Sequence, residues 1–186
     1  IETGYENLLT RLAGVDNKVQ LNIGNSVWVQ EDFDEVVYEE YKETLETHYK
    51  SEYYARPFNQ VTVNELNDWV SEKTEEKIDK ILDEISQDNV MFLLNAIYFK
   101  ADWTSQFEKS DTQKRDFTLT DGTIVQVDTM AQKEDFKYIN RTNYAACRLP
   151  YGREQVAMYI FLPDKDVKLD EFMETLDPES LDESIN

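Results

Sequence analysis

Apolar residues occupy alternate positions in residues 19–30, VQLNIGNSVWVQ, and Asn25 interrupts the alternation. Successive side chains of a β-strand point to opposite faces, so this period of two predicts a strand with one buried face. Residues 51–58 have the composition of a second, shorter strand that ends at Pro57.

A different period, with apolar residues three or four positions apart, predicts helices in three segments. Their apolar-face positions are Leu8, Leu9 and Leu12; Val37, Tyr41, Leu45 and His48; and Leu169, Phe172, Met173 and Leu176. Gly14 follows the first helix, as glycine commonly follows a helix end, and we expect that helix to begin at or before Ile1. Asp177 followed by Pro178 predicts one more helix start.

The longest predicted helix begins where Thr62 and Glu65 have the spacing of a capping box, in which each side chain accepts a hydrogen bond from a free backbone N–H. Its buried stripe would comprise Leu66, Val70, Ile78, Ile81, Leu82 and Ile85. Residues 90–100, VMFLLNAIYFK, are then apolar without alternation, which is typical of a strand covered on both faces. We expect this strand at the centre of the main sheet.

Strands dominate the second half of the chain. Residues 117–120 and 123–127 flank Asp121 and Gly122, a pair that favours a hairpin turn because the turn requires positive φ. Three more strands are predicted at residues 135–140, 144–150 and 155–162. The sequence therefore predicts an α+β fold, in which helices pack on a mixed central β-sheet and additional antiparallel sheets follow.

The chain is strongly acidic, with 39 Asp and Glu against 19 Lys and Arg and a formal net charge of −20. Such a charge repels nucleic-acid backbones and anionic lipid headgroups, so neither nucleic acid nor a membrane is an expected partner. The sequence also lacks an apolar run long enough to span a membrane. The charge by itself indicates no function.

Residues able to carry chemistry are few. His48 is the only histidine and Cys147 the only cysteine of the sequence, which excludes zinc sites built from several such ligands and a dyad that relies on a second histidine. We expect both to be packed structural residues.

Familiar ligand-binding motifs also fail. Asp164, Asp166 and Asp170 have the spacing of a calcium loop, but Leu169 and Thr175 stand where its glycine and glutamate belong. Phosphate-binding glycine motifs do not occur. We therefore expect no enzyme activity, no catalytic residue, no cofactor and no metal site.

Two residues stand out for physical reasons. Asn95 lies in the middle of the strand predicted to be buried on both faces, where an unpaired amide costs about 1–3 kcal/mol, so it implies a polar network inside the sheet. Trp103 follows that strand after a short turn, where a large ring can cap the sheet.

These residues belong to a longer set of motifs that resembles the serpin family. NAIYFKADW, residues 95–103, resembles the serpin signature on the third strand of the large sheet. The other motifs follow in serpin order: GNSVWV at 24–29, LNDWV at 66–70, TEEKI at 74–78, DGTIVQVDTM at 121–130, RLPYG at 148–152 and MYIFLPD at 158–164. In TEEKI, Glu76 stands where the family usually has glycine.

The resemblance implies that residues 1–186 are one partial serpin domain, from about helix D to helix H, with a prokaryotic source expected. Residues 1–100 would form the helical and large-sheet half, and residues 101–186 mainly strands of the second and third sheets with short helices. By resemblance, Asn95 belongs to the shutter, which controls sheet opening, and Trp103 to the breach, where loop insertion begins.

The implied function is inhibition of a serine-type endopeptidase by a suicide mechanism, with a cysteine protease as the alternative target. The protease cleaves an exposed reactive loop, and the cut loop inserts into the large sheet as a new strand. The resemblance places that loop outside this sequence, so a non-inhibitory serpin and a serpin-derived interaction domain remain alternatives. The target protease would be the partner, a secreted location is favoured, and exposed sheet edges predict self-association.

Overall fold

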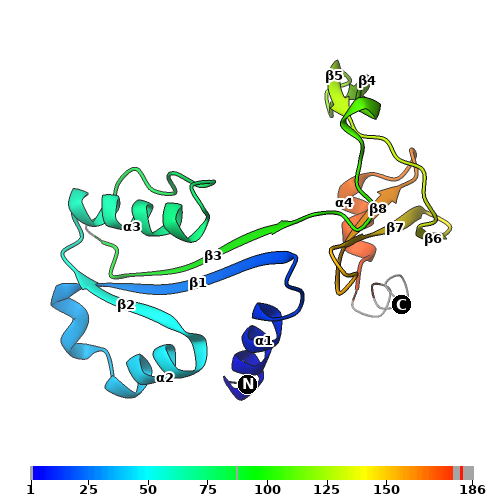
Figure 1. Cartoon of the computed structure of the whole chain (residues 1–186). Helices are drawn as coiled ribbons and strands as arrows, with labels where there is room; N and C mark the ends of the chain where they lie inside the picture. Colours follow the sequence, from blue (N-terminus) through cyan, green and yellow to red (C-terminus); the bar gives the residue numbers. More distant parts are fainter. Residues whose placement is uncertain (1, 87, 178–180, 182–186) are drawn as a thin grey trace. The chain divides into compact units, whose positions relative to one another are not determined.

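The computed structural model describes residues 2–86, 88–177 and 181, and the chain divides into two compact units, residues 1–100 and 101–186 (Figure 1). Each unit is described by itself below. The expectation that residues 1–186 form one partial domain stays a prediction. The helix start predicted at Asp177 and Pro178 lies largely outside the described residues.

The first unit consists of a three-stranded sheet and the helices beside it. In chain order its elements are α1 (Glu2–Ala13), β1 (Val19–Gln30), the 3-10 helix η1 (Glu31–Val36), α2 (Glu39–Tyr49), β2 (Ser51–Arg56), α3 (Gln60–Lys73) and β3 (Met91–Ala101). The strand order is β2-β1-β3, and β1 and β2 are parallel. Gln30 N–H bonds Val90 O at 3.0 Å and Asn25 bonds Asn95, so β3 runs against β1. The sheet is therefore mixed, as predicted.

Helices cover the sheet on both faces, with α3 on one side and α1 and α2 on the other (Figure 1). The alternation in β1 explains this arrangement. Trp28 faces α3 and joins a buried cluster with Leu66, Trp69, Val70 and Ala96. Val27 and Val29 face the other way and pack with Leu45 of α2. The prediction of one buried face is therefore wrong, because Trp28, which lies between the alternating apolar positions, is buried on the second face.

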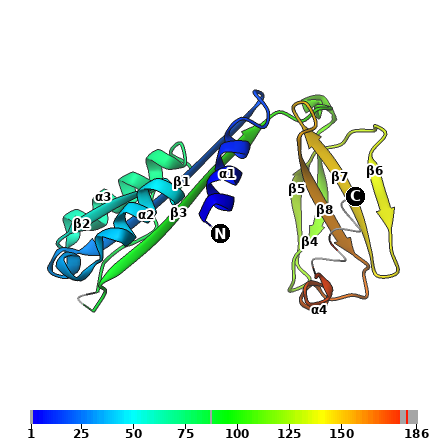
Figure 2. The ribbon, with the colours of Figure 1, turned by 90° about the horizontal axis from the view of Figure 1, so that it is seen from below.

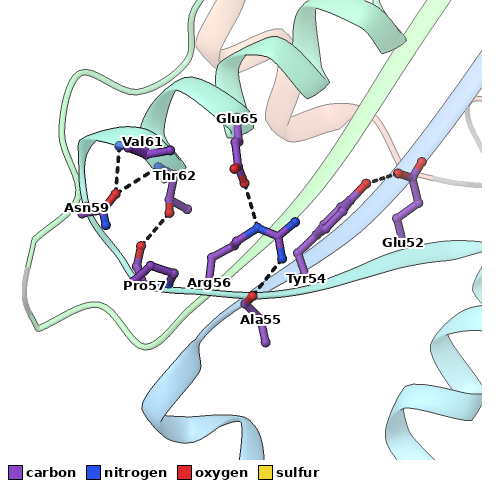
Figure 3. A network of polar contacts seen from close by, with 9 residues as sticks. All are labelled: Glu52, Tyr54, Ala55, Arg56, Pro57, Asn59, Val61, Thr62 and Glu65. Carbon is purple, nitrogen blue, oxygen red and sulfur yellow. Dashed lines mark hydrogen bonds and ion pairs between the residues drawn. The ribbon is translucent and has the colours of Figure 1, made fainter.

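The start of α3 differs from the prediction. Asn59 caps the helix, because its side-chain oxygen accepts hydrogen bonds from Val61 N–H at 2.8 Å and Thr62 N–H at 3.3 Å (Figure 3). The Thr62 hydroxyl instead donates to Pro57 O at 2.6 Å, and Glu65 pairs with Arg56. The capping box predicted at Thr62 and Glu65 is wrong because Asn59 already satisfies the free N–H groups.

The end of α3 also comes earlier than predicted, at Lys73. Glu75 and Glu76 have φ of 51° and 57°, and Glu76 N–H bonds Ser71 O at 2.8 Å, which closes the helix. A glycine normally occupies such a left-handed position after a helix, because it has no Cβ to clash. This explains the glycine that is usual in TEEKI-type motifs and that Glu76 replaces.

The segment between α3 and β3 is irregular, and the buried stripe predicted there is not a helix face. The Asn67 side chain holds the segment, since its oxygen accepts from Ile81 N–H at 2.9 Å and Leu82 N–H at 3.1 Å while its nitrogen donates to Leu82 O at 2.9 Å. Leu82 packs against the buried cluster beneath α3, whereas Ile78 and Ile81 are exposed.

The expected central position of β3 is not found within the described residues, where β3 lies at one end of the strand order. Its only neighbour among the described strands is β1. Leu93 is 66% and Ile97 58% exposed, while Ala96 lies buried against α3. The prediction of a strand covered on both faces is therefore wrong for most of β3 in the described chain. Met91 packs against the cluster of Val27, Val29 and Leu45 on the α2 side, but Leu93, Asn95 and Ile97 beyond it are exposed.

The second unit contains two antiparallel sheets and short helices. In chain order its elements are the 3-10 helix η2 (Lys109–Asp111), β4 (Gln113–Thr118), β5 (Ile124–Thr129), β6 (Lys137–Asn140), β7 (Tyr144–Tyr151), β8 (Val156–Pro163) and α4 (Leu169–Thr175). β4 and β5 form the predicted hairpin, and Gly122 in its turn has φ of 84°. The other sheet of this unit has the strand order β6-β7-β8 (Figure 2). The predicted additional antiparallel sheets are confirmed.

Candidate functional site

Asn95 joins β3 to β1. Its side-chain nitrogen donates to Asn25 Oδ1 at 2.8 Å and to Gly24 O at 3.4 Å. The polar network expected at this position is present, but Asn95 is exposed and not buried. The expected burial fails because Asn95 lies on the face of β3 opposite α3, alongside the exposed Leu93 and Ile97.

The centre of this network is Asn25, which sequence reasoning did not select. While its oxygen accepts from Asn95, its nitrogen donates to Tyr49 O at 2.9 Å and to the Tyr5 hydroxyl oxygen at 3.2 Å. Tyr5 and Tyr49 also pack together, with ring centroids 5.1 Å apart. Asn25 thus links β1, β3, α1 and α2. The sequence signal that could have identified Asn25 is the break that it makes in the apolar alternation of residues 19–30.

On the opposite face, Glu52 of β2 gathers three contacts. Lys73 Nζ lies 2.7 Å from Glu52 Oε1, and Trp69 Nε1 donates to Glu52 Oε2 at 3.1 Å. The Tyr54 hydroxyl also donates to Glu52 Oε2 (Figure 3). Two of these three partners belong to α3, so Glu52 fixes that helix to the edge strand β2.

These contacts shift the protonation of the groups involved. Partial burial alone would raise the pKa of Glu52, but the contacts from Lys73, Tyr54 and Trp69 together hold that pKa below its ordinary value of 4.5. Burial and the hydrogen bond to Glu52 raise the pKa of Tyr54 to about 12. Glu52 is therefore a carboxylate acceptor at neutral pH.

Gly24 allows α3 to approach β1 closely. A Cβ at this position would lie 3.0 Å from Lys73 Cγ and 3.3 Å from a Trp69 ring carbon. Its carbonyl meanwhile accepts from Asn95 on β3. Gly24 lies between the Glu52 contacts and the Asn25 network, so a larger side chain there would disturb the packing of α3.

Trp103 lies in the second unit, where it packs on Tyr151 of β7. The two rings are stacked, with centroids 4.2 Å apart and planes at 15°, and Phe107 meets Trp103 edge-on at 5.8 Å. The backbone supports the stack, since Thr104 N–H bonds Pro150 O and Gly152 N–H bonds Asp102 O, both at 2.9 Å. Trp103 therefore extends the β6-β7-β8 sheet. Sequence gave no sign of Tyr151 as its partner.

The residues that sequence singled out as structural have ordinary surroundings. His48 lies in the last turn of α2, with Nδ1 3.7 Å from Glu6 Oε2, and Cys147 is half-buried in β7. The described part of the chain holds no cluster of three or more His, Cys, Asp or Glu side chains suited to a metal ion. Nor is any helix in residues 2–86 or 88–177 long and apolar enough to cross a membrane.

Comparison with known proteins gives the family. The sequence profile of the family described as "Serpin (serine protease inhibitor)" matches residues 1–186. The chain belongs to the serpin family. An alpha-1-antitrypsin homolog of Cyprinus carpio is 28% identical over 95% of this chain and 47% of its own length. Serpin-Z10 of Arabidopsis thaliana is 33% identical over 87% of this chain and 44% of its own length.

Solved serpin structures share the fold. The thermophilic serpin tengpin in its native state matches with a TM-score of 0.84 and 28% identity, over 96% of this chain and 46% of tengpin. Human kallistatin matches with a TM-score of 0.88 and 26% identity, over all of this chain and 50% of its own. The chain thus spans about half the length of the serpins it matches, and the partial serpin fold is confirmed. Matches come from fish, plant and archaeon, so the expected prokaryotic source stays a prediction.

Proposed function

We propose that this chain is part of the scaffold of a serine-type endopeptidase inhibitor that traps its target by inserting a cleaved loop. The observation that carries the proposal is the serpin match over residues 1–186, together with a mixed sheet whose last described strand, β3, has one unpaired edge. An exposed strand edge offers backbone N–H and C=O groups to an added strand. The added strand would be the reactive loop, from outside these residues.

In this mechanism the chemistry belongs to the protease. Its serine hydroxyl attacks the scissile carbonyl of the loop, the peptide C–N bond breaks and releases the new amine, and the acyl part of the loop stays joined to the serine as an ester. We assign this chain no catalytic residue, cofactor or metal. Its expected partner is a serine or cysteine protease, and its charge of −20 argues against nucleic acid and anionic membranes.

The proposed roles of the two selected residues are mechanical. Asn95 and Asn25 would keep β3 and β1 together while the other edge of β3 opens, as the shutter assignment requires. Trp103, stacked on Tyr151, would form part of the breach. Both roles follow from the resemblance and are supported by the contacts.

A non-inhibitory serpin and a serpin-derived interaction domain are the alternatives. A thyroxine-binding globulin in complex with thyroxine matches this chain with a TM-score of 0.88 at 21% identity, which shows a common fold alone. Fold likeness therefore does not choose between inhibitor and carrier.

The complete product of the gene that contains this chain provides the test. Incubation with a panel of serine and cysteine proteases should give an SDS-resistant covalent complex on a denaturing gel. The 186-residue chain alone is the matched control and should give none. Cleavage of the complete product without a stable complex would refute inhibition and favour a non-inhibitory serpin.

A further inference from the structure

A polar segment at the end of β6 matches the acceptor motif for N-glycosylation. The motif is asparagine, any residue except proline, then serine or threonine, and the segment reads Asn140, Arg141, Thr142. Of the twelve asparagines in the sequence, only Asn140 is followed by such a pair. About one match of this kind is expected by chance in a chain with this many asparagines. The motif therefore needs support from the structure.

The structure leaves the acceptor amide accessible. Asn140 is the last residue of β6, and residues 140–143 are all exposed where the chain turns into β7 (Figure 2). The residue opposite Asn140 on β7 is Ala145, whose methyl group is too small to cover the amide. Within the described residues, the side chains of Asn140 and Thr142 form no hydrogen bond or ion pair. The amide and the hydroxyl of the motif are therefore both free to meet a transferase.

An exposed tyrosine lies on the same face of β6 as this amide. Tyr138 precedes Asn140 by two residues, so the two side chains project to one face, while Ile139 between them faces the other way. Tyr138 is 61% exposed. Residues two apart on a strand are roughly 6–7 Å apart, which places the ring within reach of a sugar attached to Asn140. The C–H face of a sugar packs favourably on an aromatic ring, because the ring face carries partial negative charge.

We propose that Asn140 carries an N-linked glycan and that Tyr138 packs against its first sugar. In the transfer, Asn140 Nδ2 attacks the anomeric carbon of an oligosaccharide held on a lipid pyrophosphate. A C–N bond forms, the C–O bond to phosphate breaks, the lipid pyrophosphate leaves, and the amide gives up one proton. The expected secreted location would bring the chain to such a donor. The inference does not rest on the proposed function, since an inhibitor and a carrier can each bear a glycan.

A glycan at this position would also protect a strand edge. β6 lies at one end of the sheet β6-β7-β8, and β7 is its one neighbour among the described strands. The free N–H and C=O groups of such an edge can pair with a strand of another molecule. A bulky, hydrated sugar at the end of β6 would keep other chains away from these groups.

Glycopeptide mass spectrometry tests the site on the complete product of the gene, isolated from its source. The peptide that contains Asn140 should carry the mass of a glycan, and Asn140→Gln and Thr142→Ala should each remove it. Thr142→Ser is the matched control, because it keeps the hydroxyl of the motif and should keep the glycan. A peptide without sugar would refute the site. A glycan that survives Asn140→Gln would also refute it, because the sugar would then be on another residue.

Unfolding in urea tests the role of Tyr138. Removal of the glycan through Asn140→Gln should raise the unfolding rate at least about twofold, because the contact between sugar and ring is lost. In a Tyr138→Thr background the same removal should change the rate much less. Tyr38→Thr is the matched control, since Tyr38 is 83% exposed in the first unit and its loss should leave the full effect of the glycan.

An effect of the glycan that is equal with and without Tyr138 would refute the packing of the sugar on this ring. If circular dichroism shows that Tyr138→Thr does not fold, Tyr138→Leu replaces it. Leucine keeps an apolar side chain on the strand but has no ring face, so the same reduced effect of the glycan is expected.

Discussion

Both the oxygen and the nitrogen of the Asn25 side-chain amide form hydrogen bonds. The oxygen accepts from Asn95, and the nitrogen donates to Tyr49 O and to the Tyr5 hydroxyl oxygen. Asn95 donates from its nitrogen alone and is exposed to solvent. Water can replace a lost hydrogen-bond partner at an exposed site more easily than at a half-buried one. Asn25 should therefore contribute more than Asn95 to the free energy of unfolding. Asn25 is the residue on which four elements converge.

Asn25→Ala should therefore lower the free energy of unfolding by about 1–3 kcal/mol, the cost of leaving half-buried polar groups unpaired. Asn95→Ala should cost less than about 1 kcal/mol, because the groups that it leaves are open to water. Urea unfolding followed by tryptophan fluorescence measures both. A larger loss for Asn95→Ala would show that the network is centred on β3 and not on β1.

Glu76 carries a backbone conformation that suits glycine, with φ of 57°. Glu76→Gly should therefore raise the free energy of unfolding by about 0.5–1 kcal/mol, since it removes Cβ strain in the left-handed region. Glu43→Gly makes the same chemical change at an exposed position inside α2, where glycine should cost about 1 kcal/mol. Urea midpoints that move in the same direction for both variants would contradict this explanation.

Helix α3 shows how one element can be placed by its neighbours. Asn59 caps its start, and the left-handed backbone of Glu75 and Glu76 follows its end. Glu52 of β2 binds Lys73 and so holds the helix against that strand. Its apolar face then covers Trp28 and Ala96. Of these constraints, only the apolar face can be read from spacing within the helix itself.

The stability of α3 on the sheet should depend on pH through Glu52. Its folded pKa is below the ordinary 4.5, so the stabilisation is fully present above about pH 4.5 and is lost as the pH falls through the folded pKa. The pKa values of Asp34 and Asp121 are also lowered, so the overall acid response has several sources.

The difference between wild type and Glu52→Gln isolates this contribution. Urea unfolding of both proteins should be followed from about pH 3 to about pH 7, which brackets the unperturbed pKa of a carboxyl group. Wild type should have the larger free energy of unfolding at neutral pH, and the difference between the two proteins should shrink as the pH falls. A gap that stays constant with pH would show that the carboxylate charge does not stabilise the fold.

The described chain as a whole exposes apolar strand surface that a folded monomer usually covers. On β3, Leu93 and Ile97 are more than half exposed beside an unpaired edge, and the stretch from Met91 to Phe99 carries no charge in a chain of net charge −20. Like-charged copies can approach each other most easily on a neutral surface. Self-association through β3 is therefore the expected behaviour of the isolated chain.

Sedimentation of the 186-residue chain should show a concentration-dependent dimer that strengthens as salt screens the repulsion between copies. Ile97→Lys should shift the chain to monomer, because it places a charge on the contact surface. Val61→Lys adds the same charge to an exposed position on α3 and should have little effect. A thermally stable monomer at all concentrations would contradict the prediction.

Much of the fold could be predicted because local spacing specified it. The strand at 19–30 and the turn at Asp121 and Gly122 follow from alternation and from turn chemistry, and both are present. The site was predicted only in part. Asn95 was found because an amide in an apolar run is conspicuous, but its hub Asn25 and the acceptor Glu52 look like ordinary polar residues until the strands are paired.

The sequence by itself determined the serpin family, the α+β class and the position of most helices and strands, because these depend on motifs and on periods within short stretches. The tertiary structure decided which faces are covered. Within the described residues it left β3 with β1 as its one neighbouring strand, made the predicted end of α3 an irregular segment held by Asn67, and brought Glu52 to Lys73. Burial and polar pairing are set by residues distant in sequence, so spacing along the chain does not contain them.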